Sequence, residues 1–148
     1  MKNEYPNSDL QTSVVFPLYL CSKELIRKYN TELAKYDLTY TQYLVLMYFI
    51  NEKKSNLKRI GKTMMLDSST LTPLLKKMEK KGLITRNKSS LDERNLELKI
   101  TKKGLSLEKN LQDIRIKFKD QMKMDEKEIK DLHRLTHKIL NKIQEDMQ

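Results

Sequence analysis

Apolar residues recur along most of this chain at the three- and four-residue spacing that is typical of helices. The pattern predicts three helices in the first half, over residues 14–36, 40–50 and 57–64. Thr39 is a suitable N-cap for the second of them, which is almost wholly apolar and is therefore expected to be buried on most sides. Residues 1–12 are polar and are expected to lack regular structure, and residues 51–56 are expected to form a polar turn.

A fourth helix is predicted between Asp67, as its N-cap, and Gly82, as the residue that ends it. Its core face holds four apolar residues at the spacing i, i+3, i+4 and i+7, namely Leu71, Leu74, Leu75 and Met78. Two strands are then predicted, over residues 83–86 and 96–100, of which the second alternates apolar and polar residues, and a polar hairpin tip over residues 87–93 joins them.

Two amphipathic helices complete the chain. Thr101 is expected to open a long helix with an apolar stripe at Leu107, Leu111, Ile114, Phe118 and Met122. Asp125 opens the last helix, whose stripe contains Ile129, Leu132, Thr136, Ile139, Ile143 and Met147. The fold expected for residues 1–148 is mainly α with a small β-hairpin. It is a winged helix-turn-helix lobe over residues 38–103, with N- and C-terminal dimerisation helices over residues 14–36 and 104–146.

Composition is consistent with one helix-rich globular chain. The 148 residues are 38% hydrophobic and 34% charged, with only 3 Gly and 3 Pro, which argues against a disordered protein or a β-sandwich. No apolar run approaches the length of a membrane span, and the N-terminus lacks the apolar core of a signal peptide. A single cysteine cannot form an intrachain disulfide, so we expect a cytoplasmic location.

The positive charge of the chain is concentrated in its central third. Of the net charge of +10, residues 58–103 contribute +8, from 13 Lys/Arg and 5 Asp/Glu, and the segments on either side contribute +1 each. A positive field on one lobe is expected of a surface that contacts phosphates. The charge therefore favours a polyanion over a membrane surface, since no basic helix with aromatic anchors is present. Together with the helix and hairpin described next, it makes double-stranded DNA the expected partner.

The predicted fourth helix carries a polar face suited to this partner. The N-terminal part of the second helix of a helix-turn-helix meets base edges, where small hydroxyls can donate or accept hydrogen bonds. Lysines follow at positions 76, 77, 80 and 81, from which they could reach the DNA backbone. Pro73 inside the helix typically costs about 3 kcal/mol, which an ordinary surface helix has no reason to carry. The predicted contacts are Ser68, Ser69, Thr70, Thr72, Pro73, Lys76 and Lys77.

The hairpin supplies further candidate contacts, Arg86, Lys88, Asp92 and Arg94. An arginine at the tip of such a hairpin can enter a narrow minor groove, where the negative potential is enhanced. Asp92 could hold the guanidinium of Arg94 through a charge-assisted hydrogen bond. The alternatives are a solvated hairpin tip and an ordinary amphipathic helix with a polar exterior.

Residues 66–86, together with Asp92, Glu93 and Arg94, resemble the MarR family of transcriptional regulators, and within it the OhrR/SarZ/MgrA-like branch. Residues 38–46 resemble the same branch, and the similarity extends over about residues 14–146. The resemblance implies a homodimer that binds an inverted-repeat operator, usually as a repressor, and is released by a small molecule or an oxidant.

The resemblance also implies where a sensor would lie. In the OhrR-like proteins a reactive cysteine near the start of the first helix is supported by three tyrosines, which correspond here to Tyr19, Tyr29 and Tyr40. The cysteine itself corresponds to Val15, which cannot form a sulfenate, and Pro17 is expected to delay or bend the helix beside it. We therefore expect that the peroxide chemistry is lost. Val15 and the three tyrosines remain a candidate effector pocket, with core and dimer packing as an equal alternative.

The remaining reactive side chains offer weaker candidates. Cys21, the only thiol, is interpreted either as a displaced redox switch beside Lys23 or as a small buried apolar residue, and the second is favoured. His133 and His137 have the i, i+4 spacing of two metal ligands but no third ligand around them, so no metal and no cofactor are expected. No nucleophile–base pair or phosphate loop can be argued, which excludes an enzyme. The alternative functions are a winged-helix protein-interaction module and a regulator that responds to oxidation of Cys21.

Overall fold

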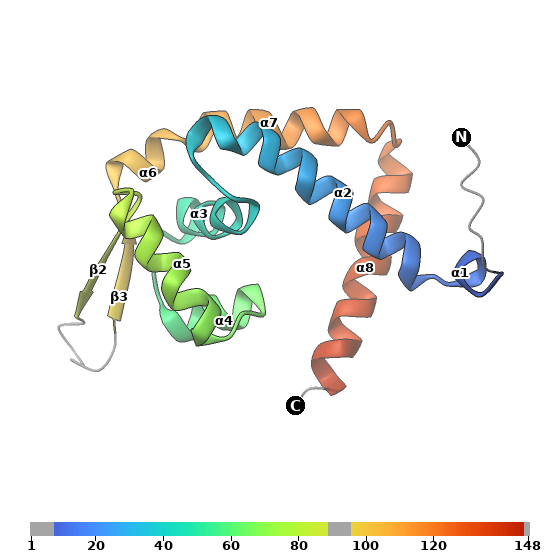
Figure 1. Ribbon diagram of the computed structural model, residues 1–148, viewed down its shortest axis with the longest axis horizontal. Helices are drawn as coiled ribbons and strands as arrows, with labels where there is room; N and C mark the ends of the chain where they lie inside the picture. The colour runs from blue at the N-terminus through green and yellow to red at the C-terminus, as the bar shows by residue number, and fades with distance from the viewer. Residues whose placement is uncertain (1–7, 89–95, 147–148) are drawn as a thin grey trace. The chain divides into compact units, whose positions relative to one another are not determined.

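The computed structural model describes residues 8–88 and 96–146, and the chain forms two compact units, residues 1–111 and 112–148. The elements of the first unit are α1 (Ser8–Thr12), α2 (Val15–Leu33), the 3-10 helix η1 (Ala34–Tyr36), α3 (Tyr40–Glu52), β1 (Lys54–Asn56), α4 (Leu57–Met64), α5 (Ser68–Lys80), β2 (Ile84–Lys88), β3 (Leu96–Ile100) and α6 (Lys102–Ser106) (Figure 1). Helix α7 (Glu108–Gln121) begins in the first unit and continues into the second, which also holds α8 (Glu126–Asp146).

The predicted helix ends are confirmed where a side chain satisfies the free backbone groups. Thr39 accepts a hydrogen bond from the backbone of Gln42 and forms a full capping box with it. Asp67 caps α5 by accepting from the backbone of Thr70 at 2.8 Å. At the other end of α5, Gly82 has a φ of 72°, the left-handed backbone for which glycine is preferred. Short polar side chains and one glycine thus fix these helix boundaries.

Two short elements differ from the prediction because no apolar pattern marks them. Helix α1 occupies Ser8–Thr12, within the stretch that was expected to lack regular structure. Residues 51–56 do not form a simple turn, since α3 continues to Glu52 and β1 follows it. Strand β1 consists of Lys, Ser and Asn, and its partner β3 lies more than 40 residues later in the chain. Pairing with β3, rather than burial of apolar side chains, therefore makes this segment a strand.

The long helix expected after Thr101 is in fact two helices. Thr101 caps α6 as predicted, but α6 ends at Ser106 and α7 begins at Glu108. Leu107, between them, donates its backbone N–H to the carbonyl of Gly104, three residues earlier. This bond spans three residues and so interrupts the i to i+4 hydrogen bonds of an α-helix. Gly104 and Ser106 are also weaker helix formers than alanine.

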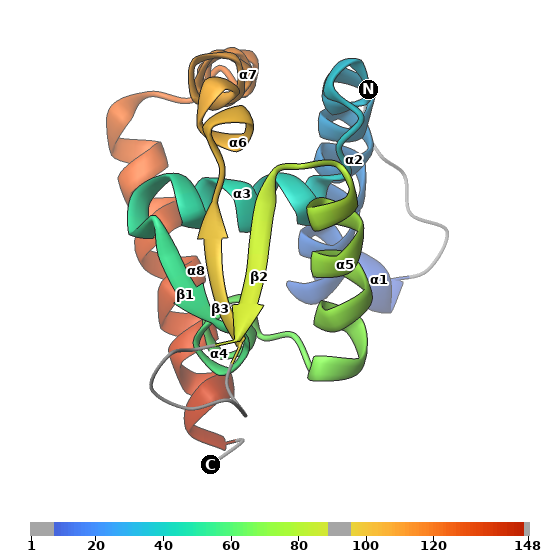
Figure 2. The same ribbon diagram turned by 90° about the vertical axis from the view of Figure 1, so that its left-hand side faces the viewer.

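The core of the first unit lies between the helices and a small antiparallel sheet. Among the described residues the sheet has three strands, in the order β1-β3-β2. Figure 2 shows α5 beside β2, with α3 running across the sheet. The fully buried side chains include Leu33, Leu46, Phe49, Ile60, Leu71, Leu75, Met78, Ile84 and Leu98. The predicted core face of α5 is thus confirmed for Leu71, Leu75 and Met78, while Leu74 is half-buried.

Apolar side chains remain exposed on the outer helices. In α7, Leu111, Ile114 and Phe118 are buried, whereas no side chain of α8 is buried in the described part of the chain. The exposed apolar residues of α8 are Leu132, Leu135, Ile139, Leu140 and Ile143, and those of α2 and its start include Val14, Val15, Leu18 and Tyr19. None of the described helices has the length and apolarity that crossing a membrane requires. The predicted stripe residue Met147 lies outside the described residues.

Candidate DNA-binding surface

The turn between α4 and α5 gives the lobe its helix-turn-helix form. Helix α4 is followed by its C-cap Met65, whose φ of 52° turns the chain sharply, and the N–H of Leu66 donates to the carbonyl of Gly61 at 2.9 Å. A Cβ atom on Gly61 would lie 2.9 Å from the carbonyl oxygen of Leu66, so the close approach of the two segments requires glycine. The turn is followed directly by Asp67 and the first residues of α5.

The N-terminal half of α5 presents the predicted polar face. Ser68, Ser69, Thr70 and Pro73 are exposed, and Thr72 is half-buried. Ser69 is already engaged, because its hydroxyl donates to Asp67 Oδ1 at 2.6 Å. This bond, followed by the one from the Thr70 backbone, lowers the pKa of Asp67 below its usual value. The Ser69 hydroxyl proton is thus already donated within the chain, which leaves its oxygen as an acceptor, a detail that the sequence pattern did not reveal.

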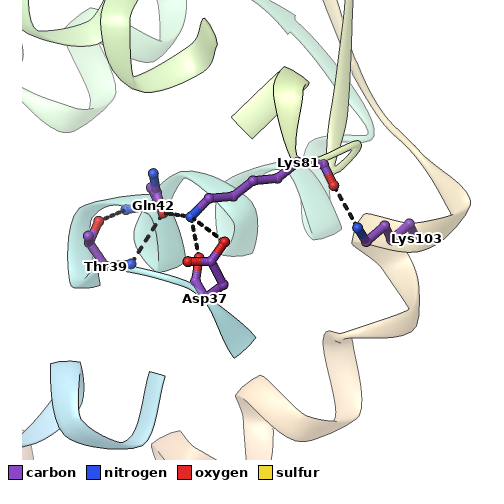
Figure 3. A network of polar contacts seen from close by, with 5 residues as sticks. All are labelled: Asp37, Thr39, Gln42, Lys81 and Lys103. Atoms are coloured by element: carbon purple, nitrogen blue, oxygen red, sulfur yellow. Dashed lines mark hydrogen bonds and ion pairs between the residues drawn. The ribbon is translucent and has the colours of Figure 1, made fainter. Parts of the chain in front are cut away.

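The lysines in the second half of α5 fall into two groups. Lys76, Lys77 and Lys80 are exposed, as expected of side chains that reach phosphates. Lys81 is directed back into the lobe, with its Nζ 3.2 Å from Asp37 Oδ2 and 3.1 Å from Gln42 Oε1 (Figure 3). The expectation that Lys81 reaches the DNA backbone is therefore replaced by a role within the lobe. The available signal was Gln42, a polar residue in the first turn of a helix that is otherwise mainly apolar.

The hairpin residues are only partly within the described chain. Arg86 on β2 donates from its Nε to Glu79 Oε2 on α5 at 2.9 Å, and its side chain is only 17% exposed. A phosphate would have to use the terminal nitrogens of Arg86, so its assignment to DNA stays a prediction. Lys88 is exposed at the end of β2. Asp92 and Arg94 lie outside the described residues, and their predicted role at the hairpin tip is untested.

Two of the four residues of the candidate effector pocket, Tyr29 and Tyr40, lie together in the structure. The rings of Tyr29 on α2 and Tyr40 on α3 meet edge to face, with 5.0 Å between their centroids. Tyr43, one turn further along α3, lies 5.7 Å from each of them and was not predicted, although its i, i+3 spacing from Tyr40 was visible. Burial raises the pKa of the Tyr40 hydroxyl. Val15 and Tyr19 are instead 73% and 59% exposed in the chain and close no pocket with these rings.

Two expectations about the start of α2, those for Cys21 and Pro17, are corrected by the structure. Cys21 is exposed, so the favoured interpretation as a small buried residue is wrong. Pro17 neither delays nor interrupts α2, because it lies in the first turn, where backbone N–H groups have no partner within the helix. The rings of His133 and His137 stack with 3.9 Å between their centroids. Among the described residues no group of three or more His, Cys, Asp or Glu could hold a metal ion.

Comparison with known proteins gives consistent matches. The family model described as transcriptional regulator SarA/Rot matches residues 27–111. The HTH-type transcriptional regulator SarZ of Staphylococcus aureus is 44% identical over 126 residues, which are 85% of this chain and 85% of that protein. The structure of overoxidized AbfR of Staphylococcus epidermidis bound to DNA aligns with a TM-score of 0.74 at 27% identity, over 91% of this chain and 95% of that one. A Staphylococcus aureus MepR–DNA complex shares the fold, with a TM-score of 0.80 at 21% identity over 88% and 98% of the two chains.

Proposed function

Because the chain belongs to the SarA/Rot family of transcriptional regulators, we propose that it represses transcription as a homodimer bound to an inverted-repeat operator in duplex DNA. The family match and the relation to SarZ confirm the resemblance to MarR-type regulators with a winged helix that was drawn from the sequence. These relatives are transcriptional regulators rather than enzymes. The work of such a regulator is done on chromosomal DNA, which favours the cytoplasm as its location.

The observation that carries this proposal is the polar face of α5 within residues 58–103, which carry a net charge of +8. Ser68, Ser69, Thr70, Lys76 and Lys77 are exposed on the second helix of the helix-turn-helix, and Pro73 lies inside that helix, where it removes a backbone hydrogen bond. AbfR and MepR, whose chains have the same fold, are both known in complexes with DNA. We assign DNA contacts to Ser68, Ser69, Thr70, Thr72, Pro73, Lys76 and Lys77 on α5, and to Arg86, Lys88, Asp92 and Arg94 on the hairpin.

Dimerisation and release complete the proposal. The apolar stripes of α2 and α8 are exposed in the single chain, and a second chain would bury them. A two-fold dimer presents two copies of α5 to successive major grooves, which calls for an operator with inverted symmetry. We assign release to a small molecule near the tyrosines of α2 and α3, with an oxidant acting on Cys21 as the alternative.

The test is the salt dependence of binding to a duplex recovered by selection from genomic fragments, measured by fluorescence anisotropy. The logarithm of the binding constant should fall steeply with the logarithm of salt concentration, with a slope of about −0.9 for each phosphate contacted. Lys76→Gln and Lys77→Gln should each reduce that slope by about 1. Lys130→Gln, which removes an exposed lysine from α8, is the matched control and should leave the slope unchanged.

The competing function is a winged-helix module that binds another protein. It requires weak DNA binding, a shallow salt slope and no preference for the selected duplex over a scrambled duplex of equal length. Either a shallow slope or equal binding to the scrambled duplex would refute the operator proposal.

A further inference from the structure

We propose that Lys81 is a positioning residue that couples the tyrosine cluster of α2 and α3 (Tyr29, Tyr40 and Tyr43) to the DNA-reading helix α5. The proposal rests on the proposed function, because it concerns how a change near the tyrosines alters DNA affinity. It assigns to Lys81 a task different from that of the neighbouring lysines of α5, which point to solvent.

The contacts of Lys81 hold the end of α5 from two sides (Figure 3). Its ammonium group donates to the backbone carbonyl of Asp37, lies 3.2 Å from Asp37 Oδ2 and donates to Gln42 Oε1 at 3.1 Å. Its own backbone carbonyl accepts from Lys103 Nζ of α6 at 2.7 Å. Lys81 is the C-cap of α5, so these bonds fix the point where the helix ends and the chain turns at Gly82.

Gln42 connects this point to the first turn of α3. Its side chain is 4% exposed, and it is the one buried polar or charged side chain among the described residues. The same Oε1 atom that accepts from Lys81 also accepts from the backbone N–H of Thr39 at 3.2 Å, while the Thr39 hydroxyl accepts from the Gln42 backbone. The capping box of α3 and the end of α5 therefore share one acceptor atom, and a shift in the first turn of α3 changes both.

The same turn is attached to α2. The backbone N–H of Tyr40, next to Thr39, donates to Asn30 Oδ1 of α2 at 2.7 Å. The Tyr40 ring packs against Tyr29 of α2 and Tyr43 of α3. Displacement of α2 by a molecule among the tyrosines would thus move Tyr40 and Thr39, and through Gln42 the ammonium group of Lys81. This is a contiguous chain of packed and hydrogen-bonded groups with α5 at its end.

A double-mutant cycle in operator affinity tests the coupling. Lys81→Met should weaken binding of the selected duplex by about tenfold without changing the salt slope, because no phosphate contact is lost. Tyr40→Ala should also weaken binding, and the two changes together should fall short of the product of their separate effects by about fivefold. Lys77→Met removes the same charge at an assigned DNA contact one turn earlier. It should reduce the salt slope by about 1 and combine independently with Tyr40→Ala.

Two results would overturn the proposal. One is independence of Tyr40→Ala and Lys81→Met within about twofold, which would mean that no energy passes between them. The other is a reduction of the salt slope by about 1 in Lys81→Met, which would make Lys81 a phosphate contact like Lys77.

Amide hydrogen exchange of the full-length protein provides a measurement that needs no DNA and a milder variant. Asn30→Ala removes the bond to the Tyr40 backbone and should speed exchange at the C-terminal end of α5, at residues 78–82. The same substitution made in Lys81→Met should cause no further acceleration there. Unchanged exchange at 78–82 in Asn30→Ala would refute the coupling. Failure of the wild-type protein to bind any duplex would instead refute the proposed function and leave the exchange result to decide the coupling.

Discussion

At the scale of single residues, Gly104 is the glycine at which neighbouring atoms leave the least room for a Cβ atom. A Cβ atom on Gly104 would lie 2.4 Å from the Leu83 carbonyl oxygen and 2.8 Å from Ile100 Cγ1. Gly104→Ala must therefore push α6 away from the start of β2, and we expect it to lower the free energy of unfolding by about 1–3 kcal/mol. Urea denaturation followed by circular dichroism measures this change. Lys102→Ala, at an exposed position of the same helix, should change stability by less than about 0.5 kcal/mol.

Asp67 makes a pH-dependent contribution at the start of α5. Its pKa is lowered in the folded chain, first by the Ser69 hydroxyl and then by the Thr70 backbone, from the ordinary value of 3.8. A carboxyl whose folded pKa is depressed stabilises the fold above its unfolded pKa and loses that contribution as pH falls through the folded value. Asn at this position can still accept from Thr70, so comparison with Asp67→Asn isolates the charge.

The wild-type protein should therefore be more stable than Asp67→Asn at pH 7, and the difference should shrink below about pH 3.8 and disappear on further acidification. Urea titrations of both proteins across this range measure it. Ser69→Ala, which removes the largest contributor, should make the pH-dependent difference smaller. A difference that stays constant with pH would show that the charge plays no part.

At the scale of elements, α5 carries a proline that its folding does not require. Pro73 is exposed inside the helix and cannot donate a backbone hydrogen bond to the preceding turn. Pro73→Ala should raise the free energy of unfolding by as much as about 3 kcal/mol, because alanine restores the bond and removes the ring clash. It should at the same time weaken operator binding, since the proline is assigned to the DNA-facing side. Higher stability with undiminished affinity would remove Pro73 from the proposed contact surface.

Elements that local chemistry defines were predictable, and those that distant pairing defines were not. The bounds of α4 and the caps Thr39, Asp67 and Thr101 followed from side chains within a few residues. Strand β1 was not predicted, because its three residues are polar and because its register, with Ser55 opposite Leu98, depends on a strand more than 40 residues later in the chain.

The candidate site divides in the same way. The hydroxyls and lysines of α5 could be read from helical spacing, because a helix places neighbouring positions on one face. The bond between Lys81 and Gln42 joins residues 39 apart in the chain, and no local pattern distinguishes Lys81 from Lys80. Exposure of Cys21 and of Val15 depends likewise on which surface of α2 the rest of the chain covers. Features of this kind depend on tertiary contacts, and they could not be predicted from the sequence.

At the scale of the whole molecule, the apolar stripe of α8 predicts how the dimer is held. Leu135 and Ile139 are 46% and 43% exposed, side chains that a second chain would bury. Leu135→Glu combined with Ile139→Glu should yield monomers in sedimentation velocity and weaken operator binding by about a hundredfold or more, because the two half-sites are no longer bound together. Lys138→Glu places one acidic residue at an exposed position of the same helix and should leave the dimer intact. A double variant that stays dimeric would exclude α8 from the interface.

Release from DNA is the property for which the chain departs most from the branch that it resembles. Val15 stands where that branch has its reactive cysteine, and Cys21 lies on another side of α2, about 120° around the helix. We therefore expect that cumene hydroperoxide, titrated into the protein–operator complex, leaves the fluorescence anisotropy unchanged. AbfR is known in reduced, overoxidized and disulfide forms, which makes an oxidant the informative challenge. Because Cys21 is exposed, Cys21→Ser is the decisive control. If hydroperoxide releases the wild-type protein and Cys21→Ser abolishes that release, oxidation of Cys21 is the switch and the sensor has moved along the helix rather than been lost.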